Sequence, residues 1–245
     1  MKFRLIIDGY RNAYENMAID EALLFYGKPT IRFYKWRPSA ISIGYFQSIC
    51  EEVNLEECKK QGVDVVRRIT GGGAVYHDEY GEITYSFVCP KNMLPEKILD
   101  SYKLICSSIA YGLHFLGLEA KHAGINDIVV NNKKISGSAQ TRRHENVLQH
   151  GTVLLKVDVR KMFSLLKVGE EKISDKVIKN IEERVTSIEK EIGKVKEEEV
   201  IEAIKKGFEE GMGIEFHEEG LTKEEMKLAE KLRRKYESKE WNFKR

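Results

Sequence analysis

Three consecutive glycines, Gly71–Gly73, lie between two segments whose composition is typical of β-strands. The stretch around them reads RRITGGGAVYHDEYGEITYSF, with two arginines before the glycines and a histidine–aspartate pair after them. Because glycine lacks Cβ and tolerates positive φ, the main-chain N–H groups here can lie close to a bound group. A row of such amides forms a concavity suited to an anion. The alternative is a glycine-rich hairpin or bulge that only reverses the chain.

The glycines match neither of the common nucleotide-binding loops. GxxxxGK[ST] and GxGxxG are both absent, and the glycines are followed by a strand-like segment rather than a helix. The neighbouring residues favour an anion-binding loop over a plain turn. Arg67 and Arg68 offer guanidinium donors that suit carboxylate and phosphate oxygens. Thr70 adds a hydroxyl, and His77 and Asp78 add polar groups just after the turn.

A second polar cluster lies in GINDIVVNNKKISGSAQTRRHENVLQHGTVLL, residues 124–155, where the two asparagines 131–132 predict a two-residue hairpin loop. In that register Val129 opposes Lys134, Asp127 opposes Ser136 and Ile128 opposes Ile135. Strand alternation then places four side chains on one face, namely Asp127, Val129, Lys134 and Ser136. Lys134 therefore shares a face with Asp127, whereas Lys133 lies at the tip, which makes Lys134 the candidate functional lysine. A bulge at the turn would reverse this choice.

Small residues and a histidine follow the hairpin loop. The segment SGSA, residues 136–139, is a second place where the backbone could approach a ligand. His150 stands in a strand-like segment beside Gly151 and Thr152. A single strand histidine is more often a core residue than a ligand contact, so the position of His150 alone decides nothing.

Composition excludes several classes of protein. The chain has 245 residues, of which 42% are hydrophobic and 33% charged, and its net charge of +2 comes from interspersed basic and acidic residues, which argues against a nucleic-acid partner. No apolar run approaches the roughly 20 residues of a membrane helix, and charge interrupts the N-terminus too early for a signal peptide. We therefore expect a cytoplasmic protein with no membrane association. The four cysteines lack the CxxC spacing of a zinc site and do not suit a disulfide framework.

The pattern of the chain predicts an α+β fold with a mixed, largely antiparallel sheet covered by helices, because strands and helices do not alternate as regular βαβ units. Strands are predicted over residues 30–36, 40–46, 63–69 and 82–88. Helices are predicted over residues 13–25, 54–61, 95–117, 167–180 and 193–211, and from a capping box at Thr222 and Glu225. From about residue 167 the chain is rich in lysine and glutamate, and we expect it to be helical.

Three motifs in this order, RRITGGGAVYHD, GINDIVV…KKISGSAQ and LQHGTVLL, resemble the signature of lipoate–protein ligases, relatives of biotin–protein ligases. NMAIDEALL and SIGYFQ match the opening segments of that family, so the resemblance covers nearly the whole chain. It implies a single class II synthetase-like catalytic domain over residues 1–245. The helical C-terminal third, from about residue 167, is expected to pack on it, with no accessory domain.

The resemblance also implies an activity. Lipoate would be adenylated by ATP, and the lipoyl group would then pass to a lysine of a lipoyl domain, with ATP, lipoate and Mg²⁺ as cofactors. The expected targets are the E2 component of a 2-oxo-acid dehydrogenase or the glycine cleavage H protein. Many members carry a C-terminal accessory domain that this chain lacks, so a separate accessory subunit is expected for activation. Familiar bacterial members read IGRNQ where this chain reads IGYFQ, which removes an arginine contact to the ATP phosphates.

Carried over residue by residue, the resemblance implies that Lys134 is the catalytic lysine, whose ammonium stabilises the negative charge of both transition states. Asp127 would hold Mg²⁺ through its carboxylate. The residues implied to bind the acyl-adenylate are Gly44, Arg68, Thr70, Gly71, Gly72, Gly73, Ala74, His77, Asn126, Asp127, Lys134, Ser136, Gly137, Ser138, Ala139, His150, Gly151 and Thr152. The aromatic residues Tyr34, Tyr45 and Phe46 are candidates to line an apolar slot near Gly44, although core packing is the commoner role.

Two other activities remain open from the sequence. An octanoyltransferase shares this fold and passes octanoate between carrier proteins through a cysteine thioester, without ATP. In such relatives the cysteine lies near the position of Gly124–Asn126 or after the HGT segment, whereas here no cysteine follows Cys106, which disfavours this activity. A non-catalytic acyl-adenylate sensor would usually carry a DNA-binding helix-turn-helix, and no segment before Arg32 is long enough for one.

Overall fold

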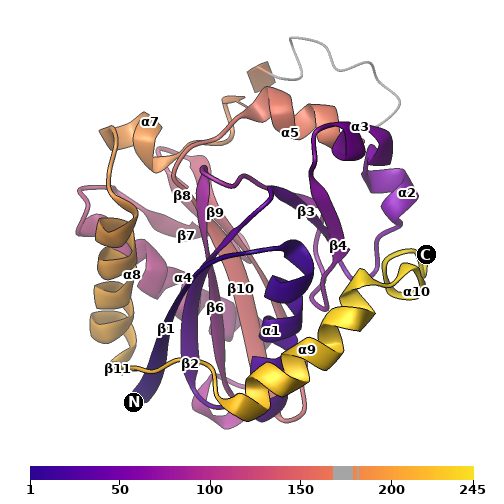
Figure 1. The fold of residues 1–245 in the computed structure, drawn as a ribbon. Coiled ribbons are helices and arrows are strands. Elements are labelled where there is room, and N and C mark those ends of the chain that lie inside the picture. Colours follow the sequence, from indigo (N-terminus) through magenta and orange to yellow (C-terminus); the bar gives the residue numbers. More distant parts are fainter. Residues whose placement is uncertain (168–178, 181) are drawn as a thin grey trace.

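The fold is taken from a computed structural model, which describes residues 1–167, 179–180 and 182–245 (Figure 1). The strands are β1 (Lys2–Arg11), β2 (Thr30–Trp36), β3 (Ala40–Ile43), β4 (Asp64–Arg67), β5 (Val75–His77), β6 (Glu82–Pro90), β7 (Lys121–Ala123), β8 (Asp127–Val130), β9 (Lys133–Arg143), β10 (Asn146–Leu154) and β11 (Glu215–Glu218). The helices are α1 (Ala13–Tyr26), α2 (Ile49–Glu52), α3 (Leu55–Lys60), α4 (Ile98–His114), α5 (Val159–Leu165), α7 (Ile188–Ile192), α8 (Glu197–Met212), α9 (Lys223–Glu237) and α10 (Lys239–Asn242), with a short 3₁₀ helix at Lys91–Met93.

A large mixed sheet forms the centre of the molecule, with the strand order β11-β1-β2-β6-β10-β9-β8-β7. Strand β1 runs parallel to both of its neighbours, β2 and β11. The other pairs in this sheet are antiparallel. The predicted α+β fold with a mixed, largely antiparallel sheet is therefore confirmed.

Helices cover both faces of the large sheet (Figure 1). On one face, α4 and α8 pack over a core that includes Phe33, Tyr85 and Phe87. The two helices approach closely at Gly207, where a Cβ atom would lie 2.2 Å from the carbonyl oxygen of Ser108. On the other face, α1 and α9 pack over a second core that includes aromatic residues of β2.

A small sheet with the order β4-β3-β5 packs with α2, α3 and α5 around a third core. The three glycines connect β4 to β5 and therefore belong to this small sheet, whereas the hairpin of β8 and β9 belongs to the large one. The two polar clusters of the sequence come together only when the two sheets pack.

The C-terminal third is less purely helical than predicted. Helix α8 begins at Glu197 rather than at the predicted residue 193, and α9 is capped by Thr222, whose side chain accepts from the Glu225 amide as the capping box requires. Strand β11, which the sequence analysis missed, adds an edge to the large sheet beside β1. The predicted helix over 167–180 lies mostly outside the described residues. The single-domain organisation without an accessory domain stays a prediction.

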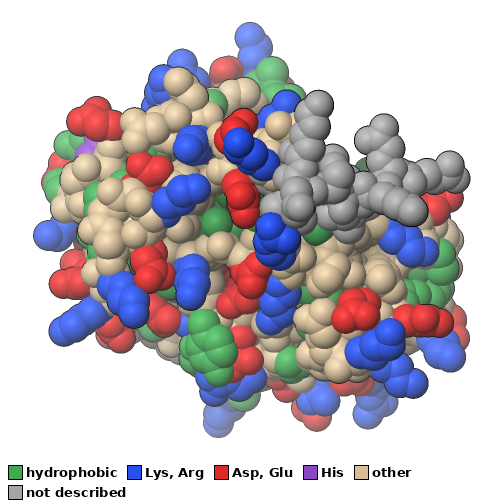
Figure 2. Space-filling model, turned by 90° about the horizontal axis from the view of Figure 1, so that it is seen from above, with side chains coloured by type: hydrophobic (Ala, Val, Ile, Leu, Met, Phe, Trp, Pro, Cys, Tyr) green, Lys and Arg blue, Asp and Glu red, His purple; other side chains and the backbone are tan. Residues whose placement is uncertain are grey.

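The predicted elements outside the C-terminal third are present with ends close to those expected, but α2, α5 and β7 were not predicted. The predicted strand 40–46 ends at Ile43, because the chain turns at Gly44, whose N–H donates to the Gln47 side chain. Strand β1 was not predicted. Within the described parts of the chain, no helix is both long and apolar enough to cross a membrane. Seen from above, the described surface carries positive and negative side chains in alternation (Figure 2).

Candidate functional site

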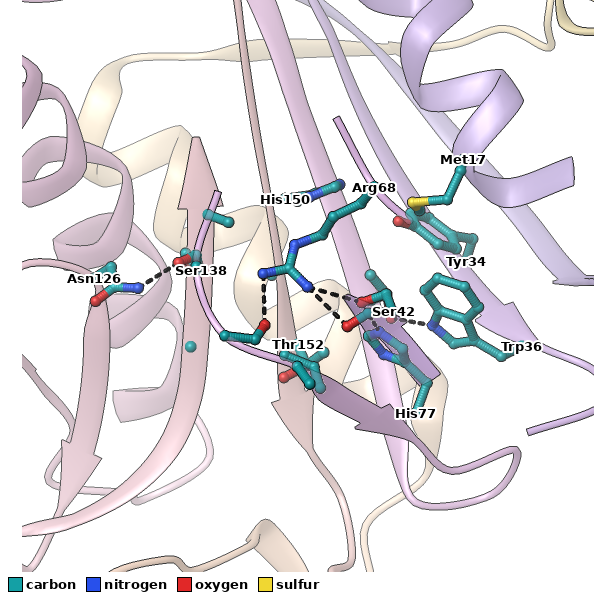
Figure 3. Close-up of a pocket in the computed structure, with 18 of the residues that line it drawn as sticks. Met17, Tyr34, Trp36, Ser42, Arg68, His77, Asn126, Ser138, His150 and Thr152 are labelled. Atoms are coloured by element: carbon teal, nitrogen blue, oxygen red, sulfur yellow. Dashed lines mark hydrogen bonds between the residues drawn. The ribbon is translucent and has the colours of Figure 1, made fainter. Parts of the chain in front are cut away.

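A cavity of about 210 Å³ lies between the two sheets (Figure 3). It brings together most of the predicted site residues, namely Arg68, Gly72, Gly73, Ala74, His77, Asn126, Lys134, Gly137, Ser138, Ala139, His150, Gly151 and Thr152. The remaining lining residues are Met17, Tyr34, Trp36, Ser42, Val75 and Thr84. The glycine turn and the candidate lysine therefore face the same space, as the sequence analysis required.

Five predicted residues do not line the cavity: Gly44, Thr70, Gly71, Asp127 and Ser136. Gly44 packs directly behind the glycine turn, since a Cβ atom there would lie 1.9 Å from the carbonyl oxygen of Gly72. Thr70 is completely buried beneath the turn. Of the aromatic residues proposed for the apolar slot, Tyr34 lines the cavity, whereas Tyr45 and Phe46 do not.

The register of the β8–β9 hairpin is right at its tip and wrong further in. Val129 pairs with Lys134 as predicted, but a bulge then shifts the pairing so that Asp127 lies opposite Gly137 and not opposite Ser136. A bulge places two residues of one strand opposite one of the other. Ser136 is consequently turned to the buried face, where it is 1% exposed. Because the bulge lies beyond Lys134, it does not change the choice of lysine.

Lys134 lies at the rim of the cavity, and its ammonium is 2.7 Å from Asp127 Oδ1. Its main chain is fixed on a second side by the segment that precedes α7, through hydrogen bonds with the Arg184 carbonyl and the Thr186 amide, both 2.8 Å. Gly137 leaves room for the side chain, since a Cβ atom there would lie 2.6 Å from Lys134 Cε. The backbone is therefore held firmly, while the ammonium stays accessible.

Of the three glycines in the turn, Gly72 has a positive φ, 91°, and Gly71 and Gly73 do not. Their N–H groups have no acceptor among the residues that the structure describes. Of these glycines, Gly72 and Gly73 line the cavity, and unpaired amides beside a cavity are the arrangement expected of an anion-binding turn. Both residues are exposed, so their amides can bind water as well as an anion, and the anion-binding role stays a prediction.

Arg67 was predicted to offer donors to an anion, and this is wrong. Its side chain is completely buried and faces away from the cavity. The guanidinium donates instead to the carbonyl oxygens of Gly44, Tyr45, Gln47, Trp241 and Asn242. Arg67 therefore ties α10 to the loop after β3.

A buried carboxylate that the sequence analysis missed lies behind His150. Asp20 is 1% exposed and accepts hydrogen bonds from His150 Nδ1 at 2.9 Å, from Arg32, from the Tyr34 hydroxyl and from Ser86. Burial by itself would raise the pKa of Asp20, but the bond from His150 and the charge of Arg32 lower it below the usual value. Burial lowers the pKa of His150 more than Asp20 raises it. We infer a carboxylate paired with a neutral imidazole.

The sequence did contain a signal for this network. Asn16 and Asp20 are four residues apart in NMAIDEALL, so they lie on the same face of α1 as its buried apolar residues. Two polar residues on the buried face of a helix need internal partners. That spacing could have identified Asp20 as part of a polar interior.

The residues present do not build a metal site on their own. Within the described part of the chain, no group of three or more His, Cys, Asp or Glu side chains is placed to hold an ion. The carboxylate of Asp127 is paired with Lys134, which argues against its predicted role as an Mg²⁺ ligand. ATP, lipoate and Mg²⁺ stay predictions.

All four cysteines lie in the described residues, and none of them lines the cavity. Cys106 lies behind the cavity wall, with its sulfur 3.8 Å from Oγ of the lining residue Ser138. It is completely buried, and burial raises the pKa of its thiol to about 11. A thiol in this state is a poor nucleophile at neutral pH.

The sequence model of the family described as "Lipoyl protein ligase A/B catalytic domain" matches residues 12–209. The chain belongs to this family. A relative from Brevibacillus brevis, named octanoyltransferase LipM, is 37% identical and aligns with 100% of this chain and 99% of its own length. A protein of the same name from Geobacillus kaustophilus is 38% identical, with 99% and 98% covered.

A solved structure from Thermoplasma acidophilum, described as a bi-partite lipoate protein ligase and its E2 lipoyl domain, is 35% identical to this family member. It superposes with a TM-score of 0.91 over 99% of this chain and 96% of the other. The predicted ligase-like catalytic fold is confirmed by this agreement. A shared fold does not decide which reaction a site performs.

The predicted reaction needs a correction. The sequence analysis expected an AMP-forming lipoate–protein ligase and disfavoured the octanoyltransferase, because no cysteine occurs where that mechanism would need it. Curated relatives that match this chain over nearly their whole length are named as octanoyltransferases, and this contradicts the ligase. The missing thiol was a weak argument because it excludes one route of transfer and not transfer itself.

Proposed function

We propose that this chain transfers an octanoyl-type acyl group from a thioester donor to the ε-amine of a lysine on a lipoyl domain. The names of its relatives support the reaction type. The observation that carries the chemistry is that Lys134 and the unpaired amides of the glycine turn meet at one cavity. The pairing of a cation with amide donors suits a reaction in which negative charge develops on a carbonyl oxygen.

The apolar part of the cavity suits the acyl chain. This part is lined by the side chains of Met17, Tyr34 and Trp36, which are only 1–2% exposed, and Val75 adds a further apolar contact. These residues come from α1, β2 and β5, so the slot exists only where the two sheets meet. Binding there would place the carbonyl end of the chain toward the polar rim.

The absence of a cavity thiol favours direct transfer. The acceptor amine attacks the thioester carbonyl, the tetrahedral oxyanion is stabilised by the Lys134 ammonium and by turn amides, and the C–S bond then breaks. An amide bond forms as the attacking nitrogen loses one proton, and the departing thiolate gains one and leaves as a thiol. At the rim, Asp127 can accept the proton from nitrogen, while the Lys134 ammonium, 2.7 Å away, can donate one to the thiolate and regain it from Asp127.

The test uses the intact chain, an octanoyl carrier protein and a lipoyl domain, with and without ATP. Mass spectrometry should show octanoylation of the lipoyl-domain lysine without ATP, and a lipoyl domain with that lysine changed to arginine should stay unmodified. Acyl-AMP formation from free octanoate and ATP, with no transfer from the carrier, would overturn the proposal.

A second arm tests the direct route. Cys106→Ala removes the thiol nearest to the cavity and should leave the rate of transfer within about threefold, because a buried thiol of raised pKa takes no part. Trapping of an acyl-enzyme thioester, or loss of transfer in a variant whose melting temperature is unchanged, would contradict direct transfer.

A further inference from the structure

Two histidines of the cavity connect a buried carboxylate to a buried hydroxyl in the same way. His150 donates from Nδ1 to Asp20, and its Nε2 lies 2.7 Å from the hydroxyl oxygen of Thr70. His77 has Nδ1 2.7 Å from Glu82 Oε1 and Nε2 2.8 Å from the hydroxyl oxygen of Ser42. We call each of these hydrogen-bonded series a histidine chain. The carboxylate, histidine and hydroxyl residues of both histidine chains are less than one-tenth exposed.

Both histidine chains end on one guanidinium, that of Arg68. Figure 3 shows its hydrogen bonds to Ser42. Its Nε donates to Thr70 Oγ1 at 3.1 Å, and its Nη1 donates to the carbonyl and hydroxyl oxygens of Ser42 at 2.9 and 3.2 Å. Its Nη2 donates to the carbonyl oxygens of Gly71 and Gly73 at 2.6 and 2.8 Å. A guanidinium has five N–H donors, and all of them are used here.

The tautomers follow from this arrangement. Because Thr70 and Ser42 each accept a hydrogen bond from Arg68, the proton of each hydroxyl is free to go to the adjacent histidine Nε2. The histidines then carry their own proton on Nδ1, facing Asp20 and Glu82. In each histidine chain, every hydrogen bond from the carboxylate to the guanidinium therefore has one donor and one acceptor.

Arg68 is 4% exposed, and among the described residues no carboxylate forms an ion pair with it. Burial lowers its pKa to about 10. Asp20 is already paired with Arg32, whereas Glu82 has His77 and Thr84 as partners and no cation. Glu82 is therefore connected to Arg68 by hydrogen bonds through His77 and Ser42, and hydrogen bonds in such a series strengthen one another.

We propose that Arg68 is a positioning residue, held by these two histidine chains, that sets the conformation of the glycine turn. With all its donors engaged, it has none left for a substrate. In a trans peptide the N–H points opposite to the preceding carbonyl, so binding the Gly71 and Gly73 carbonyls turns the N–H groups of Gly72 and Ala74 away from Arg68. These amides are then available to the oxyanion. This inference depends on the proposed acyl transfer only where kcat and KM are measured.

The decisive comparison is Thr70→Val against Thr70→Ser. Valine keeps the shape of threonine but lacks the hydroxyl that joins His150 to Arg68, whereas serine keeps that hydroxyl. Thr70→Val should lower kcat by about 10²-fold with little change in KM, because a misplaced turn costs transition-state contacts more than ground-state binding. Thr70→Ser should stay within about threefold of the unchanged chain.

A matched arginine gives the control. Arg142 also donates to backbone carbonyls, those of Pro95 and Glu96, but does not line the cavity. Arg68→Lys cannot reach the same five acceptors and should lower kcat as Thr70→Val does, whereas Arg142→Lys should leave kcat unchanged. Equal losses in the two lysine variants would overturn the proposal.

NMR chemical shifts provide a readout that does not depend on activity. The amide signals of the turn should shift further from those of the unchanged chain in Thr70→Val than in Thr70→Ser, because only valine removes the acceptor that Thr70 offers to Arg68. If the unchanged chain shows no transfer, the proposed function fails while this comparison still tests the positioning role. Equal shifts in the two variants would show that Arg68 does not set the turn.

Discussion

The two walls of the cavity are built in opposite ways. On the glycine-turn side, Arg68 and Thr70 are buried and every polar atom of their side chains has a partner, including His150 of the large sheet. On the hairpin side, the side chains of Lys134 and Asp127 are 43% and 37% exposed, and they pair with each other. One wall is fixed by a network in the interior, and the other presents a charged pair at the rim.

This difference in burial suits the two walls to different roles in the reaction. A fixed wall holds amide donors where an oxyanion forms, without reorganisation during the reaction. An exposed wall can exchange its ion pair for contacts with an incoming lysine, because an exposed pair contributes only about 0–1 kcal/mol to stability. Substitutions in the two walls should therefore differ, with activity alone lost at the rim and stability lost with it in the interior.

The largest effect is expected at the rim. Lys134→Ala removes the ammonium beside the cavity and should lower kcat by about 10²–10³-fold, the usual cost of losing one oxyanion donor. Lys133→Ala, at the adjacent position but outside the cavity lining, is the matched control and should be nearly neutral. Urea denaturation should show similar stability for both variants. A large loss of stability in Lys134→Ala would break the contrast between the walls.

A smaller effect, on stability and activity together, is expected in the interior wall. Gly44→Ala places a Cβ atom 1.9 Å from the Gly72 carbonyl oxygen, so the turn must move, at a cost of about 1–3 kcal/mol. Gly73→Ala meets no atom within 4 Å and has no positive φ, so it should fold normally. The melting temperature of Gly44→Ala should be lower than that of Gly73→Ala. Equal melting temperatures would show that the turn can move away from Gly44 at little cost in stability.

The smallest expected effect is a change of stability with pH. His150 titrates near pH 6.5 in the unfolded chain and lower in the folded one, so the unfolded state binds more protons as the pH falls. The free energy of unfolding should decrease below about pH 6.5, and Asp20, whose folded pKa is also lowered, adds a further loss below about pH 4. Urea denaturation from about pH 7.5 to 5 measures the first step. His150→Gln should flatten it, whereas His122→Asn, in the short edge strand β7, should not.

Local patterns predicted much of this molecule. Strand β2 has the predicted bounds, and the asparagine loop fixed the pairing of Lys134 with Val129 at the hairpin tip. Such features depend on residues a few positions apart, whose geometry is set by backbone sterics and by alternation. The same local information failed at the next residue, Ile128, because a bulge is chosen by how the strand packs against the rest of the sheet.

The sequence by itself therefore determined elements such as α1, β2 and α9, the family resemblance and the lysine that faces Asp127. Packing of the two sheets decided everything that depends on distant residues. It made Arg67 a structural tie, turned Ser136 inward, and brought Asp20 of α1 against His150 of β10. Burying a polar group without a partner is costly, and apart from the Ser136 hydroxyl the buried side chains named here find partners where the fold supplies them. Such a partner can lie anywhere along the chain, which is why the network around Arg68 emerges only in three dimensions.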